Sequence, residues 1–216
     1  MKTYILRSCI AAFALVASYA NAEPAEKTNS EKIRDVSPDG KFAMRISYDQ
    51  KENEHQAAES KDQPGEHPLP DGMFSAAVTA IDLISLPSKE KVAQLLPSNS
   101  LGTNFGDLTL IWSADSHWCA FYDSELGTGY TSVFNEQDGK FVKLGDQDNL
   151  HANFKGHVRN EWVTPIKWIK PGVLVLEHSA FGLDGGKEWR FEVTASFDAR
   201  GKVHVISQKK LKPKPM

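Results

Sequence analysis

The chain has 216 residues, with 28 acidic and 25 basic side chains and a formal net charge of −3 at pH 7. An acidic balance argues against nucleic acid or an anionic membrane surface as the main partner, because both are usually bound by a basic face. With only two cysteines, the chain also cannot be a disulfide-rich scaffold.

The first twenty-two residues are typical of a secretory signal peptide. Lys2 and Arg7 form a basic start, Ile10–Ala17 is an apolar run too short to span a bilayer, and Ala20-Asn21-Ala22 fits the small-x-small cleavage rule. We therefore predict cleavage after Ala22 and a mature chain that starts at Glu23. No later apolar stretch is long enough for a membrane span, so the protein is expected to be soluble and secreted or periplasmic.

Removal of this segment changes the charge and the cysteine count. It leaves 23 basic against 28 acidic side chains, a net charge of about −5. Cys9 is removed, so Cys119 is alone and no intrachain disulfide is expected. Cys119 follows Trp118 in an apolar run, which predicts a small core residue rather than a reactive thiol.

The mature chain is predicted to begin with a flexible lead-in at 23–32, followed by a single β domain at 33–208. Ser37–Lys41 has the sequence of a type I turn, with proline at its second position and glycine at its fourth. The strand Phe42–Tyr48 follows it. Residues 49–72 are polar and charged with almost nothing to bury, which indicates a long solvated loop.

Apolar and alternating runs then recur between turn sequences, and this pattern favours an all-β domain. The Asp138-Gly139 pair is a hairpin signature, and Trp189 to Phe197 alternates between apolar and polar residues. The closing residues 209–216 are basic and proline-spaced, which predicts a solvated tail. The further predicted strands are Ala76–Leu83, Val92–Leu96, Leu108–Trp112, Trp118–Tyr122, Tyr130–Phe134, Phe141–Leu144, Thr164–Trp168, Val173–His178, Glu188–Phe197 and Val203–Ser207.

Two turns share a pattern. Ser37-Pro38-Asp39-Gly40-Lys41 and Ser113-Ala114-Asp115-Ser116-His117 each combine Ser-x-Asp with a small and a basic residue, and each precedes an apolar strand. The pattern resembles the blade signature of the Tol-Pal periplasmic propeller and of similar exported repeats. The resemblance implies antiparallel, blade-like units of about four strands, in which the Asp and Ser side chains tie the turn together. In the third unit Trp168 fits, but Pro171 replaces the aspartate.

Three such units are too few to close a ring, because propellers usually have about four to eight blades. Three arrangements are left open. The sheets could pack as a compact, sandwich-like domain, two chains could complete one ring as a homodimer, or the first unit could contain two merged blades.

The sequence contains no set of residues that predicts catalysis, a metal site or a cofactor. Ser88-Lys89-Glu90-Lys91 matches Ser-x-x-Lys but lies in a turn, and Asp146–Asn149 lacks the glycine and the distal glutamate of a calcium loop. His55 and His67 lie in the polar loop without any ligand-like spacing, so we interpret them as solvated.

One polar region, His151–Trp162, connects the second and third units and could line a rim together with the Phe181 loop. We expect exposed aromatic residues to anchor a ligand and an arginine to assist them. An alternative is left open, in which Trp162 packs under the third sheet. The candidate binding residues are Trp162, Phe181, Arg159, His151 and His157.

Two functions follow from these patterns. The first is a non-enzymatic, exported binding protein for a protein or glycan partner, because blade-like repeats are general recognition scaffolds. The second is a polysaccharide or peptide hydrolase whose acid and base lie on separate loops, for example Glu161 with Asp184 or Glu125.

Overall fold

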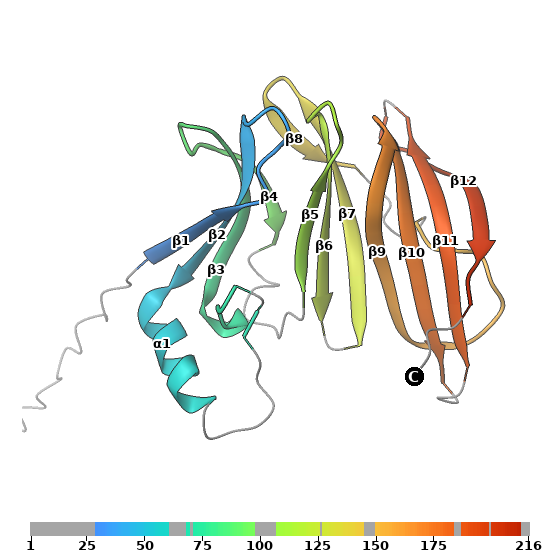
Figure 1. The fold of residues 1–216 in the computed structure, drawn as a ribbon, viewed down its shortest axis with the longest axis horizontal. Coiled ribbons are helices and arrows are strands. Elements are labelled where there is room, and N and C mark those ends of the chain that lie inside the picture. Colours follow the sequence, from blue (N-terminus) through green and yellow to red (C-terminus); the bar gives the residue numbers. More distant parts are fainter. Residues whose placement is uncertain are drawn as a thin grey trace, which may run out of the picture.

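The structure is a computed structural model that describes residues 29–60, 68–69, 71–97, 107–125, 127–144, 150–183, 187–198 and 200–212. Within these ranges the chain is mostly β, and its strands form three four-stranded units that follow one another along the chain (Figure 1). The predicted all-β class with units of about four strands is thereby confirmed. The predicted signal peptide and most of the predicted lead-in lie outside the described residues.

Each unit is an antiparallel meander in which consecutive strands pair. Unit 1 contains β1 (Asn29–Arg34), β2 (Phe42–Asp49), β3 (Val78–Ser85) and β4 (Lys91–Leu96). Unit 2 contains β5 (Leu108–Trp112), β6 (Trp118–Glu125), β7 (Thr128–Gln137) and β8 (Lys140–Lys143). Unit 3 contains β9 (Val158–Lys170), β10 (Val173–Gly182), β11 (Glu188–Phe197) and β12 (Val203–Lys210).

Units 2 and 3 are joined at one short seam. β7 and β9 run parallel and pair only at Thr128 with Glu161 and at Gly129 with Trp162, which makes one mixed sheet of eight strands. Beyond the seam, the Thr131 hydroxyl donates to the Val163 carbonyl oxygen at 2.6 Å. Unit 1 forms a separate sheet of four strands, and neither sheet closes on itself.

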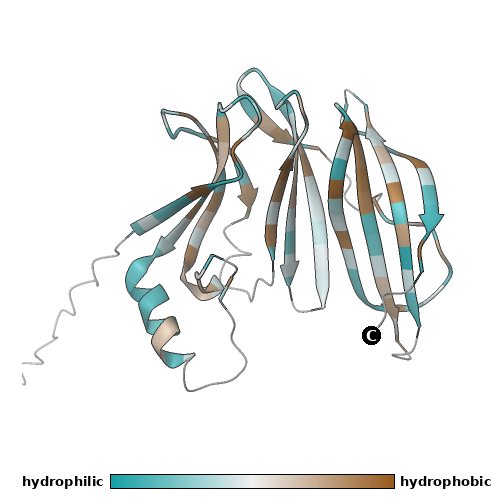
Figure 2. Ribbon diagram, viewed as in Figure 1, coloured by the Kyte–Doolittle hydropathy of each residue, from teal (hydrophilic) through white to brown (hydrophobic). Residues whose placement is uncertain are grey.

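Two hydrophobic cores hold the three units together, and unit 2 contributes to both. Phe121 of β6 lies in the core shared with unit 1, whereas its neighbour Ala120 lies in the core shared with unit 3. Figure 2 shows hydrophobic segments along the strands of all three units. Cys119 is fully buried in the first core, where burial raises the pKa of its thiol, so the prediction of a core cysteine is confirmed.

The same tryptophan contact joins each pair of neighbouring units. The Trp112 indole N–H donates to the carbonyl oxygen of Asp35 in unit 1 at 2.7 Å, and the Trp168 indole donates to that of Ile111 in unit 2 at 3.2 Å. The strand register repeats as well. Trp112 lies opposite Cys119, the second residue of β6, and Trp168 lies opposite Leu174, the second residue of β10. The repeat seen in the sequence therefore extends to the contacts between units.

The two Ser-x-Asp turns have the same hydrogen bonds. In the first, the Ser37 hydroxyl and the Lys41 N–H donate to Oδ1 of Asp39 at 2.7 and 3.1 Å. In the second, Ser113 and His117 donate to Oδ1 of Asp115 at 2.5 and 3.3 Å. The prediction that the aspartates tie their turns is confirmed.

The structure corrects three boundaries. The predicted lead-in at 23–32 overlaps β1, which begins at Asn29, and the predicted tail at 209–216 overlaps β12, which ends at Lys210. The predicted loop at 49–72 is wrong over Gln50–Glu59, which forms the helix α1. A short 3₁₀ turn, Ser75–Ala77, then precedes β3.

The helix was missed because it has no buried face. None of its residues is buried, and Figure 2 shows it as mostly hydrophilic. Its N-terminus and first turn are held by polar contacts instead. The Asp49 side chain caps its N-terminus by accepting the N–H groups of Lys51 and Glu52, and Asn53 accepts the N–H of Phe74 at 2.8 Å. The helix therefore combines an N-terminal cap with a tertiary contact and has no apolar periodicity.

We expect Asp39→Ala and Asp115→Ala each to lower the free energy of unfolding by about 1 to 2 kcal/mol, because each leaves two turn donors without their acceptor. Asp39→Asn and Asp115→Asn are the matched controls, since an amide oxygen can still accept both hydrogen bonds. Urea denaturation of the four variants measures the difference. Equal loss in the Ala and Asn variants would contradict this role of the aspartates.

Candidate functional site

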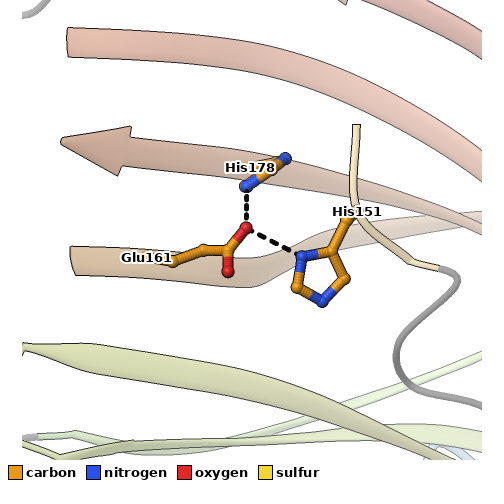
Figure 3. A group of neighbouring side chains, drawn as sticks. All are labelled: His151, Glu161 and His178. Atoms are coloured by element: carbon orange, nitrogen blue, oxygen red, sulfur yellow. Dashed lines mark hydrogen bonds and ion pairs between the residues drawn. The ribbon is translucent and has the colours of Figure 1, made fainter. Parts of the chain in front are cut away.

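Three polar side chains from separate segments, those of His151, Glu161 and His178, form one cluster. Glu161 lies on β9, His178 on β10, and His151 in the segment that precedes β9 (Figure 3). One carboxylate oxygen, Oε1 of Glu161, lies 2.6 Å from Nε2 of His178 and 2.8 Å from Nδ1 of His151. Since an ionised carboxylate only accepts hydrogen bonds, both imidazoles donate to the same oxygen.

Strand register and the second core position these groups. Val163 is paired with His178 and Ala180 with Glu161, so Glu161 and His178 are diagonal neighbours on one face of unit 3. The segment that carries His151 is fixed by Leu150 and Ala152, which are buried in the second core.

A backbone contact determines the protonation state of His178. The N–H of Ala152 points at Nδ1 of His178 at 2.8 Å, so Nδ1 must be the acceptor. Nε2 therefore carries the only ring proton, and the imidazole is neutral. Burial lowers the pKa of His178, and the opposing effect of the Glu161 carboxylate does not cancel it.

Two histidines and a glutamate are also a common set of metal ligands, and the possible ligand atoms here lie within 4.8 Å of one another. The geometry does not fit a metal centre. Nε2 of His178 holds a proton and has no lone pair to offer, as the Ala152 contact requires. In addition, ligands at about 2.0 to 2.1 Å from a tetrahedral zinc lie about 3.3 Å apart. The oxygen–nitrogen separations here are 2.6 and 2.8 Å, which are hydrogen-bond distances.

The predicted aromatic anchors contact each other on the opposite face of β9 and β10. The rings of Trp162 and Phe181 are 5.8 Å apart in an edge-to-face arrangement, and Phe181 is 37% exposed. Because successive strand residues point to opposite faces, Trp162 points away from Glu161. Trp162 is only half-buried, and it rests on Gly129 of β7, where an added Cβ would lie 2.8 Å from the indole.

The five predicted binding residues therefore do not form one group. Trp162 and Phe181 are brought together, and Arg159 and His157 are exposed near the start of β9. His151 belongs instead to the Glu161 cluster on the other face. The expectation of a loop through to Trp162 is also corrected, because β9 begins at Val158.

The carboxylates suggested for a hydrolase are placed only in part. Asp184 lies outside the described residues. Glu125 pairs with Thr128, and Thr128 pairs with Glu161, so the two glutamates lie two strand spacings apart, about 10 Å between Cα atoms. The carboxylate of Glu161 is bound by His151 and His178.

Asp123 on β6 is a titratable group that the sequence did not single out. Burial, and then the neighbouring charge of Glu125, raise the pKa of its carboxyl group to about 6. Burial also lowers the pKa of the nearby Lys143 ammonium. The only sequence signal was an aspartate two residues after Phe121 in an apolar strand.

No protein-family model matches the chain, and no curated protein resembles it closely enough in sequence to count as a relative. Among the described residues, no helix is long and apolar enough to cross a membrane. Any functional conclusion therefore depends on the geometry alone.

We expect Zn²⁺ at a few equivalents to change the melting temperature of the protein by less than about 1 °C, because a site that bound the ion tightly would stabilise the folded state by mass action. Differential scanning fluorimetry with and without Zn²⁺ measures this. A larger rise that disappears in both His151→Gln and His178→Gln would show that the cluster does bind the ion.

We expect Asp123→Asn to raise the free energy of unfolding at pH 7 by on the order of 1 to 3 kcal/mol. The pKa of Asp123 is about 6 when folded and near 3.9 when unfolded, so ionisation above pH 4 favours the unfolded chain. The gain should vanish below about pH 4, where the carboxyl group is protonated in both states. The control is Asp138→Asn in an exposed turn, and a pH-independent gain would contradict the interpretation.

Proposed function

We propose that the chain is an exported, non-enzymatic recognition protein that binds a protein or glycan through an aromatic patch on unit 3. The patch consists of Trp162, Phe181 and Leu183. The observation that carries the proposal is the edge-to-face contact of Trp162 and Phe181 on a sheet face, with Phe181 37% and Leu183 66% exposed. Exposed aromatic residues contribute much of the binding energy at protein surfaces.

The distribution of exposed apolar side chains supports unit 3 as the binding unit. Nine large apolar side chains are exposed among the described residues, and six belong to unit 3. Phe181 and Leu183 lie at the end of β10, whereas Ile166 and Ile169 lie on the part of β9 that pairs with the beginning of β10, so these isoleucines do not extend the patch. The six residues are Ile166, Ile169, Phe181, Leu183, Val205 and Ile206.

The patch is also held rigidly, which lowers the entropic cost of binding. Trp162 and Phe181 lie on paired strands, with Trp162 opposite Ser179 and Phe181 opposite Asn160. The Asn160 side chain in turn donates to the carbonyl oxygen of Gly127 at 3.0 Å. Arg159 is exposed beside Asn160 in the sequence and could supply a polar contact at the edge of the patch.

A hydrolase is the second candidate, and one observation favours it. The strand register sets Glu125 and Glu161 on either side of Thr128, and cleavage of glycosidic bonds uses a pair of carboxylates. The two histidines that donate to Glu161 fix the position of its carboxylate.

The test compares Phe181→Ala with Val142→Ala, an exposed apolar residue of β8 in unit 2. Purified protein is screened against immobilised oligosaccharides and extended peptides by biolayer interferometry. We expect one class to bind, and Phe181→Ala to weaken that binding by at least about tenfold while Val142→Ala leaves it unchanged. Binding that survives Phe181→Ala, or no binding to either class, would overturn the proposal. Turnover of a probe that is lost in Glu161→Gln would establish the hydrolase instead.

A further inference from the structure

We propose that residues 150–157 form a strap that closes over unit 3 at neutral pH and is released when His178 takes up a second proton. The strap connects unit 2 to β9 and packs on the face of β10 and β11 that carries His178 and Trp189. Its last residue, His157, accepts the N–H of Leu183 at 3.2 Å. The inference is independent of the proposed recognition function.

His178 holds the strap by accepting a hydrogen bond. The Ala152 N–H donates to Nδ1 of His178 at 2.8 Å, and both groups are buried. A doubly protonated imidazole has a donor on each nitrogen and no acceptor. Protonation at Nδ1 therefore turns this attachment into a contact between two N–H groups, and the backbone of the strap must move away.

His151, which lies on the strap itself, responds in the opposite way. Its Nδ1 donates to Glu161 at 2.8 Å, and an imidazolium at His151 keeps that donor. Protonation of His151 therefore preserves its contact and adds attraction to the carboxylate. Of the two histidines in the cluster, only His178 loses a hydrogen bond in acid.

The surroundings of His178 set the pH at which this occurs. Glu161 on β9 and His151 on the strap are the charged or titratable groups among the described residues that face it. The neighbouring ring of the strap, Phe154, and that of β11, Phe191, are aromatic and uncharged. Burial lowers the pKa of His178, so release is expected below the ordinary histidine range.

Release would uncover an apolar surface. Phe154 of the strap packs on Trp189 and Phe191 of β11, with ring centroids 5.1 and 5.6 Å apart. Gly156 lies so close that an added Cβ would meet the Trp189 ring at 2.6 Å. Gln208 of β12 is the second attachment, since its side-chain amide exchanges two hydrogen bonds of 2.9 Å with the backbone of Asn153.

Hydrogen exchange of the Ala152 amide, followed by NMR between pH 7 and pH 4, tests the proposal on the whole mature chain. We expect its exchange rate, corrected for intrinsic chemistry, to rise by at least about tenfold, while the Phe121 amide in the first core stays protected. The nitrogen chemical shift of Nδ1 in His178 should change over the same pH range.

Two variants separate the histidines. His151→Gln keeps a side-chain donor for Glu161 and should open in acid like the wild type. His178→Asn places a carbonyl oxygen near the position of Nδ1, so the Ala152 amide should change by less than about twofold. Opening that persists in a folded His178→Asn protein would overturn the proposal. So would protonation of wild-type His178 without Ala152 exchange, or loss of Phe121 protection at the same pH, which is global unfolding.

Discussion

The fold depends on a middle unit whose strand β6 is buried on both faces. In β6, Phe121 packs against unit 1 and the adjacent Ala120 packs against unit 3, so the alternation of side chains along one strand supplies two cores. A strand with only one apolar face could not do this. The unbroken apolar run from Trp118 to Tyr122 is the sequence feature that this position requires.

Repeated aromatic contacts give this stack its register and also mark its ends. Phe42 packs with Trp112 between units 1 and 2, and Trp118 packs with Trp168 between units 2 and 3. At the ends, valines occupy the corresponding positions. Val36 precedes Ser37 as Trp112 precedes Ser113, and Val173 begins β10 as Trp118 begins β6. The outer faces thus lack the aromatic pair that joins the inner ones, as is usual for terminal units of a repeat.

The sequence predicted those turns and strands whose conformation depends on a few neighbouring residues. The turns at Asp39 and Asp115 and the strands with apolar runs were predicted because a few neighbouring residues fix them. The helix at Gln50–Glu59 was missed because polar capping alone leaves no periodicity. The proximity of His151, Glu161 and His178 could not be predicted, since it arises from the pairing of β9 with β10 and from the burial of Ala152. Sequence reasoning had assigned His151 to the same surface as Trp162, and only the pleat of β9 separates them.

The cluster and the aromatic patch therefore lie on opposite faces of the same pair of strands, and the first is polar whereas the second is apolar. Trp162 and Phe181 meet edge to face, and Phe181 presents apolar area to solvent. One residue away, Glu161 is held by two imidazoles, and one of those imidazoles also fixes a backbone amide. β9 carries both Glu161 and Trp162, and the strap also contacts the patch directly, because the N–H of Leu183 donates to the carbonyl oxygen of His157 at 3.2 Å. The pairing of Gly129 with Trp162 at the seam resists a shift of β9, so we expect a movement of the strap to reach the patch at Leu183 rather than at Trp162.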